Sequence, residues 1–137
     1  MDKNKPSSFT LIENDFSDII VDVIETDQTG KSSSMLVQRR TYKLINGTKL
    51  YITEFIKDGN IDISYYDIFS KAGESLMKFH SEPHENKNYQ TATEPYHIHG
   101  NEKRKLTNQK RFSNESCKSL YQVMEFLRLL MIYTGEI

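Results

Sequence analysis

Cysteine is almost absent from this sequence, and so are long apolar runs. The single cysteine, Cys117, excludes an internal disulfide and a zinc site built from several thiolates, and it is consistent with a reducing compartment. No stretch approaches the roughly 18 uninterrupted apolar residues of a membrane span. The N-terminal MDKNKPSSFTLIEND also lacks the apolar core of a signal peptide. We therefore expect a cytoplasmic protein without a membrane segment.

The length of 137 residues predicts one domain, spanning 1–137, with its own core. Eight Tyr and seven Phe supply many residues that favour strands. We expect four segments in order: 1–16 flexible or a short helix, 17–80 a sheet, 81–112 a polar and basic loop region with the histidines, and 113–134 a helix.

Two dipeptides in the middle of the chain are strong turn signals. Asn46-Gly47 lies between YKLI and TKLYI, and Asp58-Gly59 lies between YITEFIK and NIDISYYDIF. Both pairs tolerate the positive φ that two-residue type I′ hairpin turns require. With a third reversal at SKAGES, residues 35–80 are predicted to form a four-stranded antiparallel meander, and IIVDVIE is a further candidate strand before it.

Two-residue turns would also determine which residues face each other. They place Arg39 opposite Glu54 and Ile52 opposite Tyr65. Glu54 would then lie on an apolar face, where an unpaired carboxylate is costly, so we expect an ion pair with Arg39. That pair could fix the strand register, or Glu54 could be a site acid or base while Arg39 contacts phosphate. The predicted apolar face comprises Val37, Leu50, Ile52, Ile56, Ile61 and Ile63.

The C-terminal segment SNESCKSLYQVMEFLRLLMIYTGEI is predicted to be an amphipathic helix, with Ser113 as its N-cap. Apolar side chains recur in it at helical spacing: Leu120, Val123, Met124, Leu127, Leu130 and Met131. The expected fold class is α+β, an antiparallel β-meander of four to six strands with this helix packed on one face.

The four histidines all fall within residues 80–99, and two of them form the motif PYHIHG. In extended backbone His97 and His99 project to the same side. Three interpretations remain open for the cluster. It is a solvated polar loop, a zinc site in which His84 or His80 supplies a third ligand, or a site for phosphate chemistry.

Phosphate chemistry without a metal or other cofactor needs a base, an acid and a cation. A neutral imidazole would remove a proton from an RNA 2′-hydroxyl, and a protonated imidazole would protonate the leaving 5′-oxygen. The residues that supply these groups are His97, His99, His84, Lys78 and, as a further acid or base, Glu54.

A basic segment follows the histidines, formed by Lys103, Arg104, Lys105, Lys110 and Arg111. Such a segment is either ordinary solvated surface or a contact to the phosphate backbone of a nucleic acid. Arg39 and Tyr65 are further candidates for nucleic-acid contact, although a strand tyrosine is more often a core or rim residue.

The order of these features resembles the TumE-like toxins of prokaryotic toxin–antitoxin pairs, over roughly residues 17–131. In that family a strand glutamate, a strand with two aromatic residues, a basic residue before an aromatic residue, a Pro-His and a His-x-His follow one another. They correspond here to Glu54, Tyr65, Lys78 with Phe79, Pro83 with His84, and His97 with His99. KFHSEPHE stands here in place of an arginine followed by Asp-Asn-x-Pro-His-His.

The resemblance implies a growth-inhibiting protein that is neutralised by an antitoxin and has a nucleic-acid target. The first functional hypothesis is an endoribonuclease-like toxin that uses the histidines. The alternative is a non-enzymatic module that binds nucleic acid or protein through the basic segment and a sheet edge. A homodimer is compatible with either hypothesis.

Overall fold

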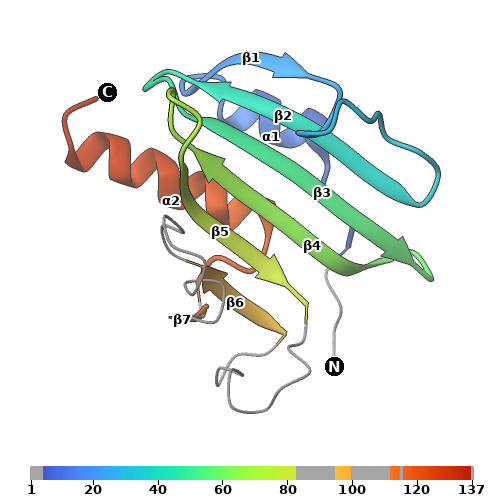
Figure 1. Ribbon diagram of the computed structural model, residues 1–137. Coiled ribbons are helices and arrows are strands. Elements are labelled where there is room, and N and C mark those ends of the chain that lie inside the picture. Colours follow the sequence, from blue (N-terminus) through green and yellow to red (C-terminus); the bar gives the residue numbers. More distant parts are fainter. Residues whose placement is uncertain (1–4, 83–94, 100–111, 115, 137) are drawn as a thin grey trace.

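The computed structural model describes residues 5–82, 95–99, 112–114 and 116–136. Within them lies one antiparallel sheet whose strands neighbour each other in sequence order, so the sheet is a meander (Figure 1). The strands are β1 (Ile20–Ile24), β2 (Val37–Leu44), β3 (Lys49–Lys57), β4 (Asn60–Phe69), β5 (Ser75–Ser81), β6 (Tyr96–His99) and β7 (Phe112–Ser113). The predicted α+β class and antiparallel meander are confirmed, and the described part of the chain holds seven strands where four to six were predicted.

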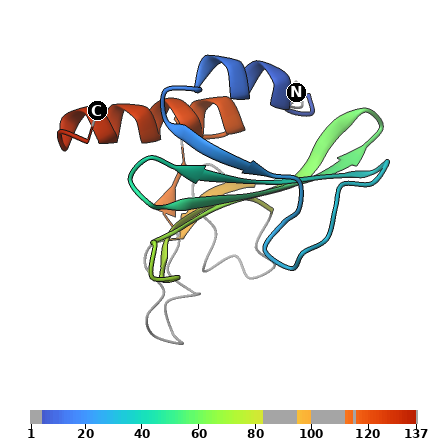
Figure 2. The ribbon, with the colours of Figure 1, turned by 90° about the horizontal axis from the view of Figure 1, so that it is seen from above.

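Two helices lie on the same side of this sheet (Figure 2). Helix α1 (Phe9–Asp15) begins after Ser8, whose hydroxyl accepts a hydrogen bond from the backbone N–H of Leu11. Helix α2 (Leu120–Tyr133) begins after Ser119, which forms a capping box with Gln122. This reciprocal pair satisfies two donors at the helix start, which explains why the helix begins there rather than near Ser113 as predicted. Neither helix is long and apolar enough to cross a membrane.

The core lies between the two helices and the sheet face that they cover. We call the side of the sheet that the helices cover the helix face, and the opposite side the open face. Buried apolar side chains from both layers meet there, including Phe16 and Ile19 after α1, Leu50 and Ile52 of β3, and Leu120, Val123, Met124, Leu127 and Met131 of α2. The predicted closure of the sheet by the C-terminal helix is therefore confirmed.

The turn at Asp58-Gly59 has the predicted two residues, with φ of 53° and 75° and with Lys57 opposite Asn60. The other turn has one residue more than predicted. Leu44 donates its N–H to the carbonyl of Thr48, and Gly47 has φ of 86°, so three residues form the loop. A three-residue loop that ends in a left-handed glycine is a common hairpin connection, and it changes the strand register by one residue.

The predicted ion pair between Arg39 and Glu54 is wrong because of this shift. Arg39 lies opposite Thr53 instead, and its Nε is 3.1 Å from a carboxylate oxygen of Asp27 on the open face. Glu54 lies opposite Gln38 in β2, on the helix face. Because side chains alternate along a strand, a one-residue change of register exchanges the side chains that share a face with a given residue of the neighbouring strand.

An irregularity between Phe55 and Ile56 shifts the pairing of β3 and β4 in the same way. Ile52 lies opposite Tyr66 rather than Tyr65, and Glu54 lies opposite Ser64. Of the predicted apolar face, Leu50 and Ile52 are buried in the core. Val37 and Ile63 both pair with Phe55, so they lie on the open face.

The segment 81–112 was predicted to be a loop region, and here the prediction was partly wrong. The motif YHIH forms β6, which pairs with β5, and Phe112–Ser113 forms β7 beside it. This extension brings the histidine motif into the sheet.

Candidate functional site

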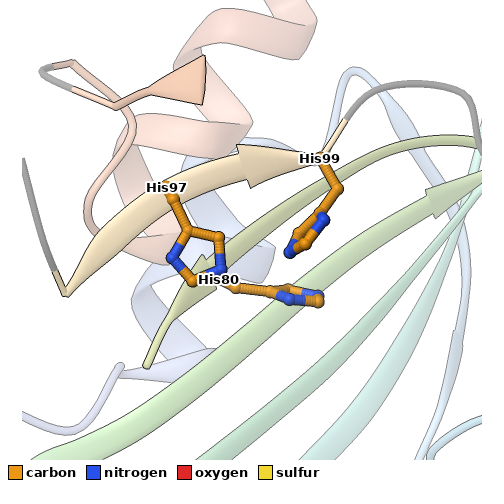
Figure 3. A group of neighbouring side chains, drawn as sticks. All are labelled: His80, His97 and His99. Carbon is orange, nitrogen blue, oxygen red and sulfur yellow. The ribbon is translucent and has the colours of Figure 1, made fainter. Parts of the chain in front are cut away.

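Three imidazoles meet where β5 and β6 pair. His80 lies directly opposite His97, and Lys78 lies directly opposite His99. The three rings converge (Figure 3), with centroid distances of 5.7 Å for His80–His97, 4.7 Å for His80–His99 and 4.9 Å for His97–His99. One ring nitrogen from each lies within 4.8 Å of the others. We call His80, His97 and His99 the histidine cluster.

The cluster lies on the open face of the sheet. Phe79 and Ile98, the sequence neighbours of these histidines, pack into the core, and the Phe79 ring is 6.0 Å from that of Phe126 in α2. Because successive side chains of a strand point to opposite faces, the histidines project away from the helices. His97 is fully buried and His99 is 5% exposed, so their rings are held by their surroundings.

Carboxylates surround the imidazole of His80. Its Nε2 is 2.8 Å from Asp67 Oδ1 on β4, and its Nδ1 is 4.0 Å from Glu82 Oε1. The Tyr65 ring packs edge-on against it at 4.7 Å, and the Tyr65 hydroxyl donates a hydrogen bond to Glu82. Burial and the Glu82 carboxylate raise the pKa of Tyr65 above its usual range, which keeps the phenol protonated as a donor.

These contacts assign the tautomers of two rings. A carboxylate or a carbonyl oxygen only accepts, so the ring nitrogen beside it carries the proton. His80 Nε2 faces Asp67, and His97 Nδ1 faces the carbonyl of Pro95 at 3.1 Å. In the neutral rings the lone pair therefore lies on Nδ1 of His80 and on Nε2 of His97.

Lys78 is the cation predicted for this site, and it lies opposite His99 in the pairing of β5 with β6. It belongs to β5, two residues before His80, and therefore projects to the same open face beside His99. Lys78 thus lies on the same face of the sheet as the histidine cluster, at the strand position opposite His99.

Glu54 is separated from the histidines by the sheet itself. It is fully buried on the helix face, where its carboxylate accepts hydrogen bonds from the backbone N–H of Ser7 (3.0 Å), the Ser7 hydroxyl (2.5 Å), Gln38 Nε2 (2.8 Å) and the Tyr66 hydroxyl (2.5 Å). Burial and the Glu54 carboxylate raise the pKa of Tyr66 well above its usual value. Glu54 therefore anchors the segment before α1 to the sheet, and the structure does not bring it to the cluster.

The predicted nucleic-acid residues are only partly placed. Tyr65 borders the cluster, and Arg39 lies on the same open face in its pair with Asp27. A hollow of about 150 Å³ on this face is lined by Asp27, Gln28, Thr29, Tyr51, Thr53, Tyr65 and Asp67. His84, Lys103, Arg104, Lys105, Lys110 and Arg111 lie outside the described residues.

Sequence reasoning considered His80 only as a third zinc ligand and omitted Asp67 and Glu82. The missing signal was the pairing of LMKFHS with YHIH. If that motif is treated as a strand beside β5, alternation places His80, His97 and His99 on one face, and Asp67 follows from the pairing of β4 with β5.

No curated protein and no solved structure matches this chain significantly. A family model described as toxin TumE matches residues 8–128, from the N-cap of α1 to within α2. That span holds most of the chain and the whole histidine cluster. A toxin family of this kind implies an antitoxin as a partner. The chain therefore belongs to the TumE toxin family, whose members are toxins of toxin–antitoxin systems.

Proposed function

We propose that this toxin acts on RNA and cleaves its phosphodiester bonds at the histidine cluster. One observation carries the proposal, namely that the pairing of β5 with β6 gathers three imidazoles and Lys78 on one face of the sheet. Proton transfer and charge stabilisation at a phosphate need these groups close together.

The proposed reaction uses the 2′-hydroxyl of RNA as the nucleophile. One neutral imidazole takes the proton of the 2′-hydroxyl while the 2′-oxygen attacks the adjacent phosphorus. The bond from phosphorus to the 5′-oxygen breaks, and a protonated imidazole transfers its proton to that oxygen. The products are a 2′,3′-cyclic phosphate and a 5′-hydroxyl, and Lys78 stabilises the negative charge that develops on the phosphate.

Direct evidence would come from incubating the purified full chain with a panel of single-stranded RNAs. General acid–base groups contribute about 10² to 10⁴-fold each, so His97→Ala or His99→Ala should remove most cleavage. The His99→Ala melting curve should stay unchanged, whereas His97 is fully buried and its variant is informative only if its melting curve shows that it is folded. Because proton transfer by imidazoles needs no metal, cleavage should persist in EDTA.

Lysine variants give a matched comparison of charge and position. Lys78→Ala should lower the rate strongly, whereas Lys57→Ala, at an exposed lysine at the end of β3, should leave it unchanged. Equal effects of the two changes, or a folded wild type that cleaves none of the RNAs, would contradict the proposal. RNA binding without cleavage would instead support the non-enzymatic alternative.

RNA binding itself is proposed to involve Tyr65, Arg39 and the basic segment at 103–111. Each lysine or arginine that contacts a phosphate of single-stranded RNA should contribute about −0.7 to the slope of log affinity against log salt. Removing Lys103, Arg104 and Lys105 together should therefore make that slope clearly shallower. A slope that does not change would remove the basic segment from the interface. The cytoplasmic location and a homodimer stay predictions.

A further inference from the structure

We infer that the histidine cluster is also a binding site for one divalent transition-metal ion, with zinc the simplest candidate. The ligands would be His80 Nδ1, His97 Nε2 and one ring nitrogen of His99. Nitrogens of these three rings already lie within 4.8 Å of one another, on two paired strands of a regular sheet.

The contacts behind the rings are those that metal-binding histidines need. Such histidines donate their outer N–H to a carboxylate or a carbonyl, which fixes the tautomer and turns the other nitrogen toward the metal. Asp67 does this for His80, and the carbonyl of Pro95 does it for His97. These two acceptors leave the lone pairs on His80 Nδ1 and His97 Nε2, the nitrogens available for a metal.

The ligand types restrict the choice of metal. Imidazole suits zinc, copper, nickel, cobalt and iron, whereas calcium and magnesium prefer oxygen ligands. Zinc–nitrogen bonds of ~2.0–2.1 Å at tetrahedral angles place ligand nitrogens about 3.3 Å apart. The rings would therefore rotate inward on binding, and water or Glu82, which is 4.0 Å from His80 Nδ1, could complete the coordination.

The metal site does not depend on the proposed RNA chemistry, but one consequence does. A lone pair that binds zinc cannot also accept a proton from a 2′-hydroxyl. If the proposed function is correct, zinc should therefore inhibit cleavage, and EDTA should restore it.

The site is tested on the full chain without RNA, after removal of metals with a chelator. Titration calorimetry with Zn²⁺ should show one ion per chain, and Co²⁺ should give the visible absorption of a four-coordinate site. His80→Asn or His99→Asn should each weaken zinc binding by more than about 100-fold. This loss exceeds the effect of removing a hydrogen bond that only orients a ligand. Two variants are used because His97 is fully buried and its replacement risks the fold.

Two aspartates of β4 test the hydrogen bond between His80 and Asp67, one by removing it and the other as a control. Asp67→Asn should weaken zinc binding by about 10 to 100-fold. Asp62→Asn changes an exposed carboxylate and should have no effect. Wild type that binds no zinc, or histidine variants that bind as well as wild type, would overturn the site. Zinc binding without RNA cleavage would overturn only the proposed function.

Discussion

On the helix face of the sheet the carboxylate of Glu54 accepts four hydrogen bonds, whereas on the open face His80, His97 and His99 lie against one another. Both regions contain buried polar side chains. Among the described residues no cation pairs with Glu54, and its donors come from the N-terminal segment, β2 and β4. Its hydrogen-bonding capacity is used inside the fold.

The histidine cluster uses its contacts differently. His80 Nε2 donates a hydrogen bond to Asp67, and His97 Nδ1 donates one to the carbonyl of Pro95, which leaves the lone pair on the other nitrogen of each ring. A buried polar group whose hydrogen bonds are all made within the fold stabilises that fold. A buried imidazole that is oriented by a hydrogen bond on one ring nitrogen can bind a ligand through the other. On this basis we assign a structural role to Glu54, and the cluster is the part of the sheet for which we propose a chemical role.

The largest effect expected from this comparison is on Glu54. Glu54→Ala would leave the donors of Ser7, Gln38 and Tyr66 without their acceptor, at about 1–3 kcal/mol for each buried group. We expect the free energy of unfolding in urea to fall by about 3–5 kcal/mol, with unchanged zinc affinity of the molecules that remain folded. Glu125→Ala, at an exposed carboxylate of α2, is the control and should change stability little. A loss below about 1 kcal/mol would show that the network is not structural.

Two adjacent tyrosines of β4 allow the stability contributions of the two faces to be compared. Tyr66→Phe removes a buried donor to the Glu54 carboxylate and should cost about 1.5–3 kcal/mol of unfolding free energy. Tyr65→Phe removes the donor to Glu82 on the open face and should cost less, because both groups are partly exposed. Equal losses in urea denaturation would contradict the distinction between the two faces.

The smallest effect concerns Arg39 and tests the register directly. A double-mutant cycle of Arg39→Ala with Asp27→Ala should give a coupling of about 0.2–1 kcal/mol, typical of ion pairs at a surface. The same cycle with Glu54→Ala should give a coupling near zero, since the sheet lies between the two side chains. A strong coupling of Arg39 to Glu54 would mean that the two-residue turn predicted from Asn46-Gly47 was correct after all.

The sequence predicted the elements well where local chemistry is strong. Asp58-Gly59 needs positive φ at two successive residues and is found as a two-residue turn, and the apolar spacing from Leu120 to Met131 is found as α2. The prediction from sequence failed at Asn46-Gly47, because the same dipeptide also fits a three-residue loop. The length of this loop decides which side chains of β2 share a face with Glu54.

By itself, then, the sequence determined the antiparallel meander, the closing helix and the likeness to a toxin family, and it named His97 and His99 as candidate site residues. Only the tertiary structure decided that His80 joins them with Asp67 behind it, and that Glu54 lies across the sheet. The physical reason is that YHIH is too short and too polar to indicate a strand alone. It becomes one by pairing with β5, and this non-local pairing is what gathers the imidazoles.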